Sequence, residues 1–501
     1  MNLLRAALPS VPVAFPETGH IPATPTCRSL NRERPHVGLL VLFGPEVRAF
    51  LYSGLAERLA RHCRVSVITT HPDSAAFAAL GREEVHAAPR EAPSYPLERF
   101  RGWNRRLHSA WMETQGQARW RNQRQPARAA EDISRPEAAR SKQTPSRKNC
   151  PGWLRTAQLV ERSLAHLSGD GKSWQRLYEQ LRLDCLIAAD YASPAAVMAL
   201  LAAARQDVAT VVFTNSWKDV YAHPYVAAPP EWIGVSGQPE ADHLRRASPH
   251  LGLDRIAVTG SLHLERFVRP GGIPSRAEFC RRTGLDSARP FLCYTAASPR
   301  VADGEESIVR GLLEAVDRHP AQPQVLLRLN PRADGERFRT LQARFAHCVV
   351  QKPRWEWDPN NDWNAPLSED LDSWVATVHH AAFNVSVPST VSLEFAAMGR
   401  LTLNVCFDAE RQPGQASNAR HWDAPFYRQI RRSPLVAGAF SAHEFHQMLA
   451  CRLSEPGAWR LSPARRMSSP VDEAERLVWS ALAAREERPL GQNPGADVRR
   501  I

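Results

Sequence analysis

The chain has 501 residues, 43% of them hydrophobic and 23% charged, with a formal net charge of +12. This length accommodates two or three domains that each bury a core, and no run of eighteen apolar residues predicts a membrane-spanning helix. The nine cysteines form no C-x-x-C pair, which argues against a disulfide framework or a zinc site and favours a reducing cytoplasm.

Most of the excess positive charge lies in one segment. Between residues 97 and 160 there are fourteen Lys and Arg residues and five Asp and Glu residues, a net charge of about +9. This insert, at 96–152, carries or borders Trp103, Trp111, Trp120 and Trp153. It is either a partly disordered surface loop or a basic, aromatic surface for an anionic membrane or a polyanionic acceptor. Nucleic acid is not expected as a partner, because no recognised binding motif accompanies the charge.

Continuous apolar strands alternate with amphipathic helices along both halves of the chain. In the first half we predict strands at 36–43, 64–70, 184–190, 209–214, 231–235 and 255–260, with helices at 46–62, from Pro194 and at 239–246. After a hinge at 261–290, strands follow at 291–295, 324–329, 347–351, 382–387 and 401–405, with helices near 304–319, 334–346, 369–380 and 390–399. This alternation predicts an α/β protein with two doubly wound, Rossmann-like parallel-sheet domains.

The predicted organisation has four parts. Residues 1–35 form a disordered tail, 36–260 an N-terminal domain containing the insert, 261–440 a C-terminal domain, and 441–501 terminal helices with a frayed tail.

The most informative motif follows the predicted strand at 382–387. Pro388 ends the strand, Ser389 and Thr390 come at the mouth of a helix, and Glu394 lies one turn into it. Hydroxyls and free N–H groups bind phosphate oxygens, and a carboxylate accepts hydrogen bonds from a ribose diol, so the motif fits a nucleotide-diphosphate site. The alternative is an N-capped helix whose Glu394 is solvated.

Two neighbouring loops emerge at the same predicted sheet edge. Ser298 follows one strand, and Arg328 and Arg332 lie at the end of the next. Ser298 would let a diphosphate approach, and either arginine would neutralise it. A plain turn at Ser298 and an exposed helix-leading charge at Arg332 are the alternatives.

These residues resemble a family. Arg328-Leu-Asn-Pro331 and Ser386-Val-Pro-Ser-Thr-Val-Ser-Leu-Glu394-Phe-Ala-Ala-Met-Gly399 look like the donor-site signature of GT-B-fold glycosyltransferases of the bacterial surface-polysaccharide type, related to CDP-glycerol and Kdo transferases. The stretches 47–54, 214–219 and 258–261 agree with it, and the resemblance covers about 36–430 outside the insert. Relatives often have His before the Pro, where this chain has Asn330.

The resemblance implies a nucleotide sugar held by the C-terminal domain, an acceptor held by the N-terminal domain, and transfer without a bound metal or other cofactor. By motif position, Arg328, Ser389, Thr390 and Glu394 would bind the donor.

An acceptor hydroxyl needs a base within hydrogen-bond reach. Glu46, after the first strand, is the first candidate, followed by Asp190 and Asp219. Glu46 could instead be a first-turn carboxylate favoured by the helix dipole. Arg48 and Trp217 are candidate acceptor-binding residues.

Three histidines suggest a metal site only weakly. His379, His380 and His421 have no further ligand at a suitable spacing, so we predict no metal.

The sequence therefore predicts a cytoplasmic glycosyltransferase that acts on a surface-glycan or lipid-linked acceptor, with peripheral contact at the inner membrane surface as a further expectation. A nucleotide-sugar 2-epimerase and a catalytically silent GT-B scaffold that binds nucleotide or glycan are the alternatives.

Overall fold

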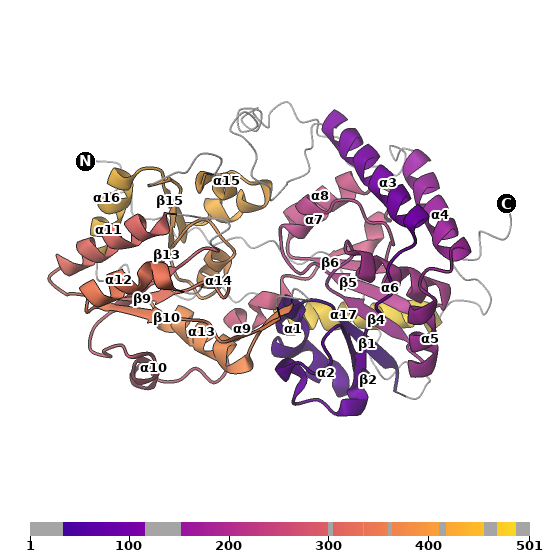
Figure 1. Cartoon of the computed structure of the whole chain (residues 1–501), viewed down its shortest axis with the longest axis horizontal. Coiled ribbons are helices and arrows are strands. Elements are labelled where there is room, and N and C mark those ends of the chain that lie inside the picture. The colour runs from indigo at the N-terminus through magenta and orange to yellow at the C-terminus, as the bar shows by residue number, and fades with distance from the viewer. Residues whose placement is uncertain are drawn as a thin grey trace.

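The computed structural model describes residues 34–115, 152–298, 304–333, 335–358, 363–409, 417–454 and 468–486. Within these ranges the chain forms two α/β lobes that lie side by side (Figure 1). The expectations for the N-terminal tail, for 116–151 of the insert and for the last residues of the chain lie outside the described residues.

The first domain is built on a parallel sheet. Its described strands number seven, in the order β3-β2-β1-β4-β5-β6-β7. They are β1 (His36–Val41), β2 (Arg64–Thr69), β3 (Val85–Ala87), β4 (Cys185–Ala188), β5 (Ala209–Phe213), β6 (Trp232–Val235) and β7 (Ile256–Val258). The strand order reverses between β1 and β4, which makes the edge beyond their carboxyl ends the topological switch point where such sheets bind ligands.

Both faces of this sheet are covered. Along β1, Val37 and Leu39 belong to one core and Leu40 to the other, as the two-residue period of a strand requires. The covering helices are α2 (Leu55–Ala60), α5 (Lys172–Leu181), α6 (Pro194–Arg205) and α8 (Gln238–Ala247). The continuous apolar strands of the sequence are thus explained by burial on both sides.

The second domain repeats the plan. Its six described strands follow the order β10-β9-β8-β13-β14-β15, all parallel. They are β8 (Phe291–Thr295), β9 (Gln324–Arg328), β10 (Cys348–Gln351), β13 (Asn384–Ser386), β14 (Thr402–Val405) and β15 (Val436–Ala439). Helices α10 (Arg276–Thr283), α11 (Glu305–Asp317), α12 (Glu336–Arg344), α13 (Ser368–His380), α14 (Val391–Ala397) and α16 (Ala442–Ser454) complete the domain. The predicted fold class is confirmed.

Two elements connect the domains. The hairpin of β11 (Trp355–Asp358) and β12 (Trp363–Pro366) leaves the second domain and packs on α1 (Gly44–Val47) of the first. A Cβ on Gly44 would lie 1.9 Å from the carbonyl oxygen of Asn364, so only glycine allows this approach. Helix α17 (Pro470–Glu486), yellow in Figure 1, crosses back and buries Leu477 and Val478 in the core of the first sheet.

The helix predicted at 46–62 is wrong in detail. The structure has α1, then a π-helical segment at Arg48–Tyr52, and then α2. Gly54, at φ 87°, separates the last two, because this backbone conformation is accessible mainly to glycine.

The interpretation of the insert as a loop is wrong for its first part. Residues Tyr95–Thr114 form α3, which packs against α4 (Gly152–Leu167). The buried face of α3 includes the polar residues Arg101, Asn104 and His108. The sequence therefore lacks the regular spacing of apolar residues that predicts an amphipathic helix. Arg101 is buried because its Nε donates to Glu161 of α4 at 2.5 Å.

Candidate functional site at the domain junction

Loops from the carboxyl edges of both sheets meet at the junction of the domains. Arg48, in the π-helical segment after β1, forms an ion pair of 2.5 Å with Glu394 of α14, which follows β13. The other oxygen of Glu394 accepts a hydrogen bond of 2.7 Å from Trp374 Nε1. The structure therefore brings a predicted acceptor-side residue and a predicted donor-side residue into direct contact.

Arg48 is held from several sides. Its guanidinium donates to the carbonyl of His263 at 3.1 Å and lies 5.2 Å from the ring centre of Phe267. A π-helical turn exposes backbone groups that an α-helix would satisfy and often marks a functional position. The segment aims Arg48 across the domain boundary.

His263 lies beside this ion pair. Its Nε2 is 2.6 Å from Asn215 Oδ1, in the loop after β5. Burial lowers the pKa of His263 to about 3, and the charge of Arg48 contributes to this decrease, so the imidazole is neutral at physiological pH. A neutral imidazole donates one hydrogen bond and accepts another, and it adds no charge to the junction.

The three candidate bases follow β1, β4 and β5, on adjacent loops of the switch point. Glu46 is 1% exposed and accepts hydrogen bonds from the backbone N–H groups of Leu42 and Phe43. Burial raises the pKa of Glu46 to about 8 against these hydrogen bonds, and the charges of Asp190 and Asp219 add to the rise.

Each aspartate also binds its own loop. Asp190 Oδ1 accepts from the N–H groups of Ala192 and Ser193 at 2.8 and 3.2 Å. Asp219 Oδ2 accepts from the N–H of Ser216 at 2.7 Å, and burial raises the pKa of Asp219 to about 6. Asp219 is only partly buried, whereas Glu46 is buried, so an acceptor can reach Asp219 more readily.

The predicted phosphate-binding hydroxyls lie at the start of α14. Ser389 is partly buried and Thr390 is exposed. Thr390 occupies the N-cap position but makes no side-chain capping hydrogen bond, so the alternative of a simple cap is not what the structure has.

Arg328 lies at the end of β9, as the sequence predicts, and its guanidinium binds other residues of the protein. It is 5% exposed, forms an ion pair of 2.7 Å with Asp370, and donates to Gln351 Oε1 at 2.8 Å. Its guanidinium also lies 5.5 Å from the ring centre of Trp374, which itself binds Glu394. These contacts hold Arg328 behind the junction, where it supports Trp374, and a direct donor contact would require it to exchange partners.

The remaining predicted residues are spread around the junction. Ser298 is partly buried after β8, and exposed Arg332 stacks 5.1 Å from the ring centre of Trp357. Trp217 is buried against Phe426 and Tyr427 of the second domain, at ring-centre distances of 5.3 and 5.5 Å. Trp217 therefore joins the two domains.

Several junction residues were not assigned to the site from the sequence. His421, in α15 (Ala419–Trp422), hydrogen-bonds the carbonyl of Pro388, and burial lowers its pKa to about 4. The Tyr427 hydroxyl donates a hydrogen bond of 2.7 Å to Ser392 Oγ, on the buried side of α14. His263 follows the Val258-Thr-Gly-Ser261 stretch of the family resemblance, which was the one available signal for it.

Metal sites and membrane spans are not found in the described ranges. Within them, no three His, Cys, Asp or Glu side chains are grouped so that they could hold a metal ion. Across the same ranges, every helix is too short or too polar to cross a bilayer.

The comparisons with known proteins agree with this architecture. No protein-family model matches the chain, and no curated protein matches it in sequence. Among solved structures, the UDP-GlcNAc 2-epimerase from Neisseria meningitidis, bound to UDP-GlcNAc, is similar at TM-score 0.50 and 12% identity, over 89% of this chain and 100% of that chain. A UDP-N-acetylglucosamine 2-epimerase candidate from Listeria monocytogenes is similar at TM-score 0.52 and 10% identity, over 91% and 98%.

A glycosyltransferase from Rickettsia africae is also similar, at TM-score 0.45 and 9% identity over 91% and 97% of the two chains. Identities this low establish shared architecture alone. The two structures with TM-scores of 0.50 and 0.52 confirm the predicted resemblance at the level of the fold, without the CDP-glycerol or Kdo type. The chain has the GT-B fold, in which two doubly wound domains meet at the carboxyl edges of their sheets.

Proposed function

We propose that this protein is a glycosyltransferase that moves a sugar from a nucleotide-sugar donor to a surface-glycan or lipid-linked acceptor. One observation carries the proposal. Arg48 of the first domain forms an ion pair with Glu394, which lies on the helix that follows Ser389 and Thr390 in the second domain. The same edge of the first domain carries three carboxylates, Glu46, Asp190 and Asp219. The residues that we propose for the donor phosphates and the carboxylates that we propose for proton transfer thus lie at one junction.

On the donor side, Ser389 and Thr390 supply hydroxyls that α14 does not use as a side-chain cap. Glu394 already binds Arg48 and Trp374, so a ribose that took one of its oxygens would compete with the domain-bridging ion pair. Donor binding would then be coupled to the relative placement of the domains. Such coupling suits an enzyme that completes its site on binding.

On the acceptor side, Asp219 is the best-placed base. With a pKa of about 6 it is mostly ionised at pH 7, and its position on the α7 turn (Asp219–Ala222) leaves it partly accessible. Glu46 is mostly protonated at that pH and is occupied by the backbone, which suits a structural carboxylate. We therefore assign the acceptor proton to Asp219, whose pKa the charge of Asp190 helps to raise.

A nucleotide-sugar 2-epimerase is the second candidate. The two structures named above with TM-scores of 0.50 and 0.52 carry that description, and the first was solved with UDP-GlcNAc. Epimerisation at a C–H centre needs one group to remove a proton and another to return it, and three coupled carboxylates could supply both. A catalytically silent scaffold would bind the nucleotide and catalyse neither sugar transfer nor epimerisation.

The deciding experiment uses the full chain with labelled nucleotide sugars. Thermal shifts with UDP-, GDP-, CMP-, CDP- and dTDP-linked ligands select the donor, because a ligand bound only by the folded state raises its stability. That donor is then incubated with and without glycan or lipid-linked acceptors. Acceptor-dependent nucleotide release supports the transferase, and interconversion of the free nucleotide sugar supports the epimerase. Binding of the nucleotide sugar without either reaction would support the catalytically silent scaffold.

Variants assign the roles of residues in this assay. Ser389→Ala/Thr390→Ala should weaken nucleoside diphosphate binding about tenfold or more and change nucleoside binding little, because only the diphosphate presents the anion. Equal losses for both ligands would count against a phosphate role. We also expect turnover to persist in the presence of a chelator, as a metal-independent reaction requires.

A further inference from the structure

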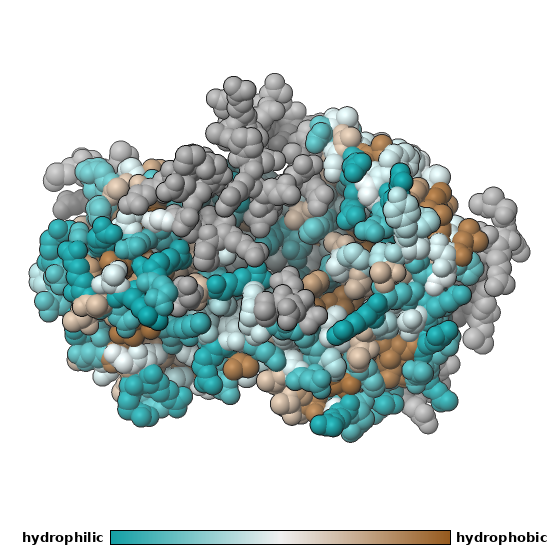
Figure 2. All heavy atoms as spheres, viewed as in Figure 1, coloured by the Kyte–Doolittle hydropathy of each residue, from teal (hydrophilic) through white to brown (hydrophobic). Residues whose placement is uncertain are grey.

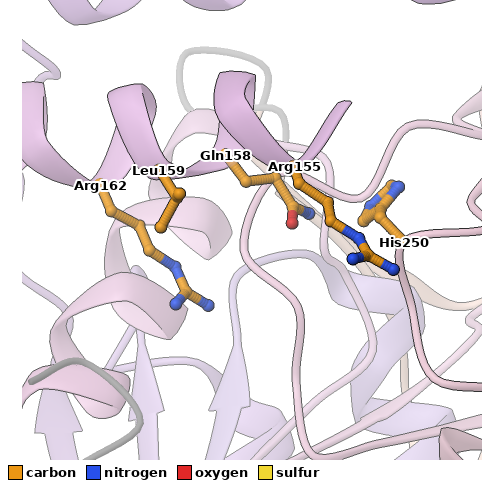
Figure 3. Close-up of a pocket in the computed structure, with 5 residues that line it drawn as sticks. All are labelled: Arg155, Gln158, Leu159, Arg162 and His250. Carbon is orange, nitrogen blue, oxygen red and sulfur yellow. The ribbon is translucent and has the colours of Figure 1, made fainter. Parts of the chain in front are cut away.

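A polar cavity lies away from the domain junction. It has a volume of about 410 Å³ and lies under α4, with His250, from the loop after α8, on its other side. In Figure 3, four side chains of α4 extend to the same side of the helix, and His250, from a separate loop, lies beside Arg155 at one end of this row. The lining residues are Arg155, Gln158, Leu159, Arg162 and His250.

The cavity has positive charge without a matching carboxylate. Among the described residues, neither Arg155 nor Arg162 forms an ion pair. Glu161, the acidic neighbour of Arg162, is fully buried on another face of α4, where it binds Arg101 and accepts from the Tyr225 hydroxyl at 3.2 Å. Its charge is therefore already matched.

Polar atoms at the cavity lack partners. Arg162 Nε and His250 Nδ1 are both buried without a hydrogen bond among the described residues. Gln158 Nε2 donates to the Val226 carbonyl at 3.1 Å, and His250 Nε2 lies 3.4 Å from the same oxygen. Buried donors and acceptors left unpaired cost free energy, so a ligand that paired with these two atoms would recover part of that cost.

The local field repels further positive charge. Burial lowers the pKa of Arg162, and Arg255 lowers it further, with Glu161 opposing. Burial lowers the pKa of His250 to about 4, and His108 and Arg155 add to this against the Val226 hydrogen bond. An anion in the cavity would oppose these effects and favour the charged forms of both side chains.

We propose that this cavity binds a phosphate group through Arg155 and Arg162, at a site separate from the donor site. Arg155 and Arg162 both line the cavity, and a guanidinium binds the oxygens of an anion in bidentate geometry. The group could belong to a lipid headgroup or to a small phosphorylated molecule. The site does not depend on the proposed function.

The surroundings include apolar surface that suits a lipid source. Within the described ranges seven large hydrophobic side chains are exposed, and five of them, Tyr95, Trp103, Leu159, Val160 and Leu167, lie on α3 or α4. Figure 2 shows hydrophobic residues at the surface of the lobe that carries these helices. Of the tryptophans noted in the sequence, Trp111 and Trp153 instead pack against the core.

The test measures binding of inorganic phosphate to the full chain by calorimetry at low salt, in a Ser389→Ala/Thr390→Ala background that weakens the donor site. We expect Arg155→Gln/Arg162→Gln to weaken the remaining binding at least tenfold. Arg176→Gln on α5, an exposed arginine outside the cavity, is the control and should change nothing.

A second pair of variants leaves Arg155 and Arg162 unchanged. Leu159→Glu places a negative charge at the rim and should weaken phosphate binding, whereas Leu167→Glu, on the same helix but outside the cavity, should not. Both positions are exposed, at 44% and 81%, so folding should be retained, and melting temperatures check this. Phosphate binding that is absent, or equal in all these folded variants, overturns the proposal.

Vesicles then distinguish the sources of phosphate. Sedimentation with phosphatidylcholine–phosphatidylglycerol vesicles that is lost in Arg155→Gln/Arg162→Gln but kept in Arg176→Gln supports a lipid headgroup. Phosphate binding without vesicle binding supports a small phosphorylated ligand.

Discussion

Replacing Glu46 with glutamine should remove a pH dependence from the stability of the first domain. Glu46 is buried, and its pKa rises from 4.5 to about 8 on folding. The folded state therefore binds more protons than the unfolded state between these values. Stability from this group is fully present below pH 4.5 and is lost as the pH rises through about 8.

The magnitude follows from the pKa shift. One proton released on unfolding corresponds to about 1.4 kcal/mol per pH unit within the window, so about 2 to 3 kcal/mol between pH 5 and pH 7 is at stake. The neutral amide of the Glu46→Gln variant would resemble the protonated acid, and its oxygen could still accept from the N–H of Phe43. The variant should therefore match the parent near pH 5 and exceed its stability near pH 8.

The assay is urea unfolding, followed by tryptophan fluorescence, of the parent, Glu46→Gln and the exposed control Glu57→Gln across this pH range. The difference between parent and variant isolates the contribution of Glu46. If the two curves run parallel from pH 5 to pH 8, the carboxyl is ionised in the folded protein and the assignment of Glu46 as a protonated structural group fails.

Three further predictions concern the junction. Asp219→Asn should lower turnover about a hundredfold or more and remove a limb near pH 6 from the rate profile, which pH-rate measurements check. Gly44→Ala should lower the melting temperature, since the new Cβ meets the Asn364 backbone at 1.9 Å, and an unchanged melting temperature would mean that the hairpin moves freely. Arg48→Ala should strengthen donor binding in calorimetry, because it frees the Glu394 oxygen for which the ribose would compete, and this gain should disappear when Arg48→Ala is combined with Glu394→Gln.

The architecture could be predicted because its signals are local. Strands such as Val37–Val41 are apolar throughout, and turns and prolines separate them from amphipathic helices. The helix α3 was missed because its buried face contains Arg101, which is stable only when paired with Glu161 on a helix 60 positions away in the sequence. Periodicity cannot show such a partner.

The site was predictable only in part, for the same reason. Ser389, Thr390 and Glu394 form a short motif, and the carboxylates follow predicted strands. The contact between Arg48 and Glu394 joins residues 346 positions apart, and the burial of Arg328 depends on Asp370 from α13. Which polar residues face the ligand and which support the fold is decided by tertiary packing.

Calorimetric titration of the selected nucleotide sugar tests the central claim most directly. The parent and the control Ser287→Ala, an exposed serine outside the junction, should bind it equally, and Ser389→Ala/Thr390→Ala should bind it about tenfold or more weakly. Equal binding by all three proteins, or no binding of any nucleotide sugar by the parent, would contradict a donor site at the domain junction.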